Sequence, residues 1–230
     1  MSGIEAFSPK GMLHEGWSAQ VDDYAIVCGW ALEGQTFLVG DVAGGLYAFE
    51  GKSGKLIWQT KNIHEGGLLA MSIHPDGHVF ATAGQDGNII FWESKEGKQT
   101  KNLKLGKGWV EHIKWSTNGK FLAGVFTKYV YVFDEKGQEQ WRSEEHPSTV
   151  SAIEWSNSNE LATACYGRVT FFDVASNKVN QKLQWRGSLV SMVLSPDGDI
   201  VACGSQDNSV HFWRRSTDQD SEMTGYPGKP

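Results

Sequence analysis

The chain has 230 residues, of which 40% are hydrophobic and 12% aromatic, enough to bury a substantial core as one domain. Its net charge of −6, from 27 acidic and 21 basic residues, argues against a nucleic-acid partner, because binding to phosphates favours a positive face. No apolar run approaches the ~20 residues of a membrane span, and residues 1–11 lack the apolar stretch of a signal peptide. We therefore expect a cytoplasmic protein with no membrane partner.

The cysteines and histidines do not suggest a metal site. Cys28, Cys165 and Cys203 are an odd number without close spacing, which argues against a disulfide framework and against a zinc knuckle. Each lies in an apolar run with strand character, so we expect three buried, reduced thiols. His74 and His78 flank a hairpin turn, point apart and lack a third ligand. We predict no metal and no cofactor.

A short turn recurs along the chain at a nearly constant interval. Its five copies are ALEG (31–34), HPDG (74–77), STNG (116–119), SNSN (156–159) and SPDG (195–198). Each turn is followed by an alternating apolar run that ends in an aromatic residue. These end residues, at intervals of 39 to 43 residues, are Phe49, Trp92, Phe133, Phe172 and Trp213. Two independent features with one period of about 40 residues predict five copies of one structural unit.

The units follow one another along the chain after an N-terminal segment, residues 1–20. Their approximate limits are 21–62, 63–105, 106–144, 145–184 and 185–226. In each unit a first apolar strand precedes the turn, a second follows it, and the run that ends in an aromatic residue is the third. A more polar fourth strand closes the unit. Period-two alternation and β-branched or aromatic content indicate strands, and no segment shows helical spacing over a sufficient length.

Four antiparallel strands in about 40 residues, repeated five times, predict an all-β propeller with four-stranded blades over residues 21–230. One such sheet cannot cover both of its faces. Neighbouring sheets therefore have to stack and bury one another.

The chain resembles the WD40-repeat family over about residues 21–218. The second unit follows the family pattern best, with His64, Leu68, Met71, Ile73, Pro75-Asp76-Gly77, Ala81-Thr82, Asp86-Gly87 and Trp92-Glu93 at the pattern positions. The resemblance implies that His64 bonds to both Asp86 and Thr82. It also implies that the Trp92 indole bonds to the Thr82 hydroxyl, which completes a structural tetrad.

The same side chains could instead form a nucleophilic triad of Thr82, His64 and Asp86. A triad requires a hydroxyl that faces a substrate cleft, together with a site for an oxyanion. Thr82 is expected to point into a strand interior and to bond to a partner there. Because a buried carboxylate and a buried indole N–H each need hydrogen-bond partners, we interpret the four residues as structural and predict no catalytic residue.

Unit five carries a partial tetrad. It has Asp207 and Trp213 at the expected positions. Trp185 stands where the histidine is expected, and Cys203 stands where the hydroxyl is expected.

Unit four carries a different partial tetrad, with His146 and Thr163. Its turn, CYGR, is one residue short and lacks the aspartate. Units one and three lose all four members. When all partners of a hydrogen-bonded group are replaced by apolar residues, the stability of the fold can be almost unchanged. We therefore expect these units to remain stable.

In the WD40 family, the loops between second and third strands and the loops between units lie on one face, which commonly docks partners. The resemblance places on this face Gln85, Tyr166 and Gln206 from the first loop type and Trp109, Glu111 and Trp185 from the second. Aromatic residues framed by polar groups are typical of interface anchors. The alternative is that Trp109 and Trp185 pack between blades.

These observations predict a non-catalytic scaffold or assembly subunit that binds other proteins. One alternative is a quinoprotein-like enzyme, since residues 44–58 are similar to the repeat of those propellers. Another is a phosphate- or nucleic-acid-binding propeller, suggested by lysines at every third position from Lys95 to Lys107. On an extended strand that spacing alternates faces, so we expect the lysines to protect an exposed blade edge instead.

Five units leave the closure of the ring open. WD40 propellers mostly have seven blades, so the resemblance implies a further propeller segment, or another chain, that completes the ring. The alternative is a closed five-bladed ring in which residues 1–20 form a closure strand.

Overall fold

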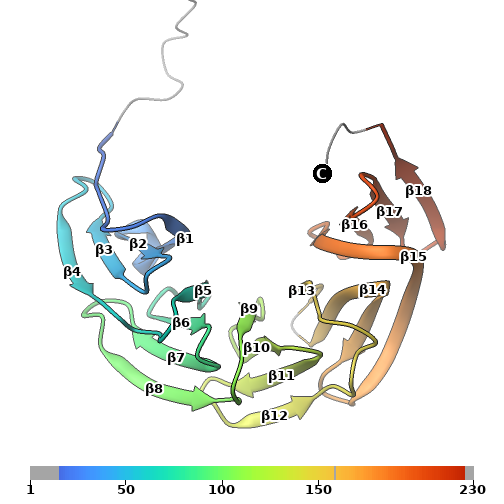
Figure 1. Ribbon diagram of the computed structural model, residues 1–230, viewed down its shortest axis with the longest axis horizontal. Helices are drawn as coiled ribbons and strands as arrows, with labels where there is room; N and C mark the ends of the chain where they lie inside the picture. Colours follow the sequence, from blue (N-terminus) through green and yellow to red (C-terminus); the bar gives the residue numbers. More distant parts are fainter. Residues whose placement is uncertain (1–15, 158, 226–230) are drawn as a thin grey trace, which may run out of the picture.

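The computed structural model describes residues 16–157 and 159–225. Its strands form antiparallel sheets that lie side by side along an open arc in chain order (Figure 1). The first strand of each unit lies on the inner side of the arc, and the fourth lies on the outer side. The predicted all-β propeller is therefore confirmed. The described residues contain one short 3-10 turn and no helix with the length and apolarity needed to cross a bilayer.

The first three sheets contain four strands each. Sheet one consists of β1 (Ala25–Ala31), the 3-10 turn η1 (Leu32–Gly34), β2 (Thr36–Asp41), β3 (Leu46–Glu50) and β4 (Leu56–Thr60). Sheet two consists of β5 (Leu68–Ile73), β6 (Val79–Gly84), β7 (Asn88–Glu93) and β8 (Gln99–Lys104). Sheet three consists of β9 (Val110–Trp115), β10 (Phe121–Phe126), β11 (Tyr129–Asp134) and β12 (Glu139–Arg142).

The fourth and fifth units are joined in one six-stranded sheet. Its strands are β13 (Ala152–Trp155), β14 (Glu160–Asp173), β15 (Lys178–Leu194), β16 (Ile200–Ser205), β17 (Val210–Arg214) and β18 (Gln219–Met223). β14 contains both the second and the third strand predicted for unit four. β15 continues through the predicted boundary at 184/185, pairing first with β14 and then with β16. We call β13, β14 and the first part of β15 sheet four, and the rest sheet five.

The pairing registers repeat the period found in the sequence. In four units the third and fourth strands slip in register at the predicted end aromatic, namely at Phe49, Trp92, Phe133 and Phe172. A bulge of this kind bends a strand and increases its twist. The aromatic residues therefore mark the point where each outer strand turns along the rim.

The hydrophobic core is divided among the spaces between neighbouring sheets. Between sheets one and two, Leu38 and Ala48 pack with Leu68 and Phe80. Similar clusters lie between sheets two and three, three and four, and four and five. Side chains that point to opposite faces of one sheet enter different clusters, so each sheet is stabilised by both of its neighbours.

The first sheet has a face that no other sheet within residues 16–157 and 159–225 covers. Trp17 partly covers it, packing on Phe37 and Phe49 with ring centroids 6.1 and 6.0 Å away, and its indole donates to the Gly51 carbonyl at 2.9 Å. Trp30 on the same face is 53% exposed. Residues 16–20 contain no strand, and residues 1–15 of the predicted closure strand lie outside the described residues.

The prediction for the cysteines was wrong at one position. Cys165 and Cys203 are buried, whereas Cys28 is exposed, and all three are free. Cys28 lies on β1 beside Val39, on the uncovered face of sheet one. An apolar strand becomes buried only where a second sheet packs on it.

The last sheet has an uncovered face of its own. Val193 on β15 and Met223 on β18 are 60% and 52% exposed. Figure 1 shows sheets one and five standing apart, with the gap between them. The described residues therefore form an open arc, not a closed five-bladed ring.

Candidate functional site

Four polar side chains of the second unit meet in the interior of sheet two. His64 Nδ1 lies 3.0 Å from Asp86 Oδ1, and His64 Nε2 lies 3.0 Å from Thr82 Oγ1. The Trp92 indole N–H donates to Thr82 Oγ1 at 2.9 Å. His64 is 3% exposed and Thr82 is 0% exposed. The predicted tetrad residues thus lie together in one hydrogen-bonded chain.

The donors fix the direction of each hydrogen bond. The indole N–H can only donate, so the Thr82 oxygen accepts from Trp92 and its hydroxyl proton points to His64 Nε2. Nδ1 then carries the imidazole proton and donates it to Asp86. Burial lowers the pKa of His64, although Asp86 opposes this effect, so the ring is neutral in this chain of bonds. A neutral imidazole that accepts the hydroxyl proton has the polarity of a base, but the Thr82 side chain is fully buried.

The Asp86 carboxylate also orders the loop that follows β6. It accepts from the backbone N–H of Asn88 at 3.1 Å and from the Asn88 amide at 2.6 Å. Burial raises the pKa of Asp86, but the bonds from His64 and Asn88 outweigh it and leave the pKa below its usual value. An ionised carboxylate therefore holds this loop against the preceding connection.

Unit four replaces the missing aspartate with a backbone group. His146 Nε2 lies 3.0 Å from Thr163 Oγ1, as in the second unit, while Nδ1 lies 3.0 Å from the Lys128 carbonyl. The tryptophan position holds Phe172, whose ring centroid is 5.9 Å from that of His146. The pair is therefore satisfied without a carboxylate and without an indole.

The arrangement in unit five differs both from the tetrad of unit two and from the His146–Thr163 pair of unit four. Asp207 accepts from the Ser209 hydroxyl at 2.6 Å and orders its own turn. Trp185 donates to Ser205 Oγ at 3.3 Å, and its ring lies 4.0 Å from the buried His211 ring. His211 also contacts Trp213 at 4.1 Å. Tilted contacts between aromatic rings thus take the place of the tetrad.

Unit one carries a polar pair that the sequence did not reveal. The Tyr47 hydroxyl donates to Asp41 Oδ2 at 2.9 Å and accepts from the Asp22 backbone N–H at 3.2 Å. Burial, together with the nearby Asp41 carboxylate, raises the pKa of Tyr47 to about 12. The tyrosine of the GLYAF run was the available signal, but its partner precedes it across a turn and matches no repeat position.

The predicted partner residues lie where the two loop types of a unit meet, although Glu111, Tyr166 and Trp185 belong to strands β9, β14 and β15. The Gln85 backbone N–H donates to the Gly67 carbonyl at 3.1 Å, and that of Gln206 donates to the Ser188 carbonyl at 3.0 Å. In unit four, Ser148 Oγ accepts from the Tyr166 backbone N–H at 2.9 Å. The two loop types of a unit are therefore neighbours, and together they form what we call the loop face.

The side chains on the loop face differ in exposure. Tyr166 and Trp109 are 56% and 51% exposed. Gln206 is exposed, while Gln85 and Glu111 are half-buried. Trp185 is half-buried against His211 of its own unit, and the roles predicted for Trp109 and Trp185 stay predictions. Tyr24, at 83%, and Val42, at 40%, are further exposed apolar residues here, and the Val42 N–H donates to the Tyr24 carbonyl at 2.9 Å.

The lysine-rich stretch does not form one free basic patch. Lys101 donates to the Lys136 carbonyl of the next sheet, and Lys104 donates to the Asp86 carbonyl. His74 bonds to the Gly119 carbonyl at 3.1 Å, which links the turns of units two and three. Within the residues that the structure describes, no group of three or more His, Cys, Asp or Glu side chains could hold a metal ion.

Comparisons with known proteins agree with this architecture. The family "WD domain, G-beta repeat" matches residues 179–214, and "Anaphase-promoting complex subunit 4 WD40 domain" matches residues 44–118. A chain in "Crystal Structure of Mitotic Checkpoint Complex" superposes with a TM-score of 0.79 and 18% identity, over 92% of this chain and 68% of that one.

Curated relatives match over longer stretches. Echinoderm microtubule-associated protein-like 2 of Mus musculus is 24% identical over 89% of this chain and 38% of that protein. Small ribosomal subunit protein RACK1 of Schizosaccharomyces pombe is 24% identical over 66% of this chain and 38% of that protein. The chain thus spans less than half the length of these relatives. With the repeated sheets and these matches together, the chain belongs to the WD40-repeat family.

Proposed function

We propose that the protein is a non-catalytic scaffold that binds other proteins through its loop face. The exposed aromatic residues Trp109, directly before β9, and Tyr166, within β14, are the observation that carries this proposal. Large aromatic side chains on a rigid surface bind with little loss of conformational entropy and are frequent interface anchors. The cytoplasmic location expected from the sequence remains a prediction.

The state of Thr82 supports the non-catalytic interpretation. Its side chain is fully buried, and its oxygen already bonds both His64 and Trp92. A nucleophile needs access to a substrate and a place for the developing oxyanion. The negative net charge and the engaged lysines likewise favour protein partners over nucleic acid.

Substitution of the exposed aromatic residues tests the scaffold role. We expect Trp109→Ala and Tyr166→Ala each to weaken capture of binding proteins by roughly 30-fold, since an anchor residue contributes about 2 kcal/mol. The measurement is affinity capture from the native source with quantitative mass spectrometry. Ile57→Ala, at a residue that is 49% exposed on the outer strand β4, is the matched control. Equal capture by all three variants would rule out the loop face.

We further propose that additional four-stranded sheets, from the same polypeptide or from another chain, pack on the uncovered faces of sheets one and five. The exposed Trp30 and Val193 support this, because in the rest of the arc such apolar faces are buried by a neighbouring sheet. An uncovered sheet face of this kind is a liability in solution.

The reactivity of Cys28 tests whether a further sheet covers sheet one. Cys28 is exposed on the face of sheet one, whereas Cys165 and Cys203 are buried. We expect a maleimide to modify Cys28 in the isolated 230-residue chain and to react much more slowly with the same thiol in the native assembly. Denatured protein is the control for the other two cysteines. Equal reactivity of Cys28 in both states contradicts a covered face.

A further inference from the structure

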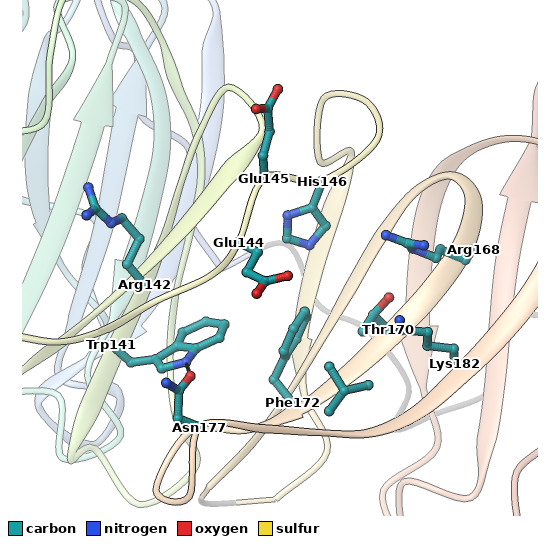
Figure 2. A pocket seen from close by; sticks show the side chains of 11 residues that line it. Trp141, Arg142, Glu144, Glu145, His146, Arg168, Thr170, Phe172, Asn177 and Lys182 are labelled. Carbon is teal, nitrogen blue, oxygen red and sulfur yellow. Dashed lines mark hydrogen bonds between the residues drawn. The ribbon is translucent and has the colours of Figure 1, made fainter.

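A cavity of about 250 Å³ opens on the rim between sheets three and four (Figure 2). One wall is the end of β12 and the connection after it, with Trp141 and Glu144. The other wall is one face of β14, where Arg168, Thr170 and Phe172 alternate. Strand alternation places these three side chains on the same side of the sheet. The cavity is smaller than the ≈ 300–1,000 Å³ of typical small-molecule sites and suits one or two side chains.

The cavity occurs where the tetrad of unit four is incomplete. In unit two the Trp92 indole reaches Thr82, and Asp86 binds the far side of the histidine. Unit four has Phe172 at the tryptophan position and no aspartate, so an indole and a carboxylate are both lost from this region. The loss leaves space next to His146, which is 4% exposed.

Two cations at the cavity lack anionic partners, Arg168 on β14 and Lys182 on β15, which pairs with Thr170. Arg168 and Lys182 form no ion pair within the described part of the chain, and Arg168 Nε is buried without a hydrogen-bond partner. Burial lowers the pKa of His146, with a smaller contribution from the Arg168 charge, so the imidazole adds no third cation. A buried guanidinium N–H without an acceptor is costly, and a ligand oxygen would satisfy it.

The other charged side chains around the cavity contact partners of their own, with the exception of Glu144. Arg142 lies over the Tyr131 ring at 5.6 Å, and Glu145 pairs with Lys128 at 3.2 Å. Glu144 has no ion pair within the described residues, and Figure 2 shows its side chain between the two walls. The Glu144 carboxylate would repel an anionic ligand and therefore lowers the affinity of the cavity for anions.

The two walls meet at an apolar floor, where Trp141 of one wall contacts Phe172 of the other. The Trp141 and Phe172 rings lie 5.1 Å apart at 53°, and the Trp141 indole donates to Asn177 Oδ1, which holds the ring in place. Val179 beside them is 46% exposed. A surface of this kind suits an apolar side chain that accompanies an acidic one.

We propose that this cavity binds a carboxylate side chain of a partner peptide, with a neighbouring aromatic or aliphatic residue on the Trp141–Phe172 floor. Arg168 and Lys182 bind the carboxylate, and a guanidinium is suited to do so by two parallel hydrogen bonds. The cavity adjoins the loop face, since Arg168 follows Tyr166 closely. The inference therefore deepens the proposed function by naming a ligand class for one part of that surface.

A dipeptide titration tests the site without any natural partner. The probe is N-acetyl-Glu-Phe-amide, followed by the indole N–H signals in nuclear magnetic resonance spectra of the whole chain, with the Trp141 signal identified by Trp141→Phe. We expect saturable shifts of the Trp141 signal, and at least tenfold weaker binding of N-acetyl-Gln-Phe-amide. A folded chain that shows no shift, or equal binding of both probes, overturns the proposal.

The variants separate this site from a general effect of charge. We expect Arg168→Gln and Lys182→Gln each to weaken binding of the acidic probe roughly tenfold, and Glu144→Gln to strengthen it. Lys98→Gln, outside the cavity, should leave it unchanged. Unaltered affinity in Arg168→Gln, or inorganic phosphate that displaces the probe at equal concentration, contradicts a carboxylate-peptide site. Because neither Trp109 nor Tyr166 lines the cavity, the site can fail while capture through the loop face succeeds, or the reverse.

Discussion

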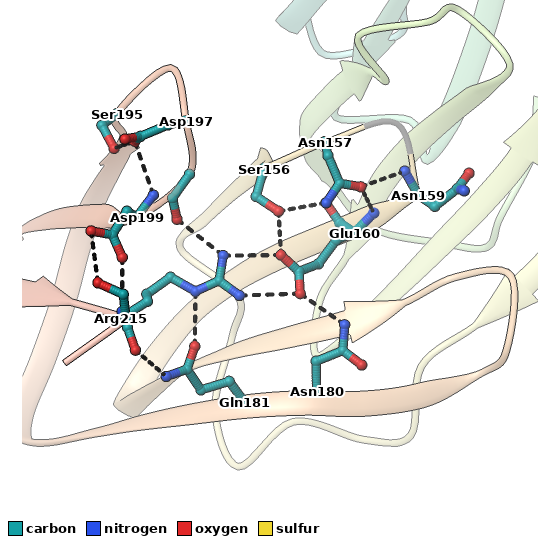
Figure 3. A network of polar contacts seen from close by, with 12 residues as sticks. Ser156, Asn157, Asn159, Glu160, Asn180, Gln181, Ser195, Asp197, Asp199 and Arg215 are labelled. Atoms are coloured by element: carbon teal, nitrogen blue, oxygen red, sulfur yellow. Dashed lines mark hydrogen bonds and ion pairs between the residues drawn. The ribbon is translucent and has the colours of Figure 1, made fainter. Parts of the chain in front are cut away.

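Arg215→Ala should lower the free energy of unfolding by about 3 kcal/mol, because it leaves a buried carboxylate without its cation. Arg215, just after β17, forms a two-pronged ion pair with Glu160 at the start of β14, with N–O distances of 3.0 and 3.1 Å (Figure 3). Its guanidinium also lies 3.6 Å from the centre of the Phe171 ring. Glu160 is 8% exposed. The pair therefore connects sheets four and five away from solvent.

The polar groups around Glu160 keep it ionised, so the Arg215→Ala variant would retain a buried negative charge. Burial raises the pKa of Glu160, but bonds from Arg215, Asn180 and Ser156 outweigh it and keep the carboxyl ionised. Gln181 meanwhile accepts from Arg215 Nε at 2.8 Å. Removing the guanidinium would leave the Glu160 carboxylate without its cation and the Gln181 amide oxygen without its donor, while the bonds from Asn180 and Ser156 to Glu160 remain.

The neighbouring Arg214 provides a matched control for this prediction. It pairs with Asp199 at 3.0 Å, but its side chain is 49% exposed. Exposed pairs contribute ~0–1 kcal/mol, so Arg214→Ala should change stability little. The measurement is urea denaturation followed by tryptophan fluorescence. Equal losses in the two variants would show that the Arg215 pair is no more than a surface contact.

Thr82→Val should lower the free energy of unfolding by about 2–4 kcal/mol, because valine has the same shape but cannot bond to either neighbour. The Trp92 indole N–H would lose its acceptor, and His64 Nε2 would lose its donor. Each buried polar group left unpaired costs about 1–3 kcal/mol. Thr82→Ser keeps the hydroxyl and should cost ~1 kcal/mol for the lost methyl group.

Unit four supplies an internal comparison for the tetrad. Thr163 bonds His146 at 3.0 Å but has no indole partner, so Thr163→Val should cost about half as much as Thr82→Val. The measurement is the urea midpoint of each of the three variants. Where the denaturant slope m is the same, the midpoints rank the variants by free energy of unfolding. A Thr163→Val cost as large as that of Thr82→Val would mean that the indole bond contributes nothing.

The fold could be predicted from the sequence because the repeat is defined by features that lie close together in the chain. Turn residues and end aromatics depend only on neighbours in the same hairpin, and Phe49 to Phe172 do mark real register shifts. The polar chain through His64 could be anticipated for the same reason: all its members lie in one repeat of known pattern.

Contacts between units were beyond the reach of the sequence. Arg215 and Glu160 are 55 residues apart in the chain, and no spacing rule connects them. The exposure of Cys28 depends on whether a second sheet covers β1, which no local pattern specifies. The cavity beside Arg168 likewise lies where unit four lacks two tetrad members, and a missing residue leaves no motif in the sequence.

The continuous strand β15 limits how this propeller can vary. Sheets one to three are separate hairpin assemblies that a gene rearrangement could duplicate or delete as modules. β15 instead serves two sheets at once, pairing with β14 from Lys178 to Ser188 and with β16 from Leu189 to Leu194. A cut between units four and five would therefore fall inside a continuous strand, not in a linker. These two repeats should therefore be inherited, swapped or lost together.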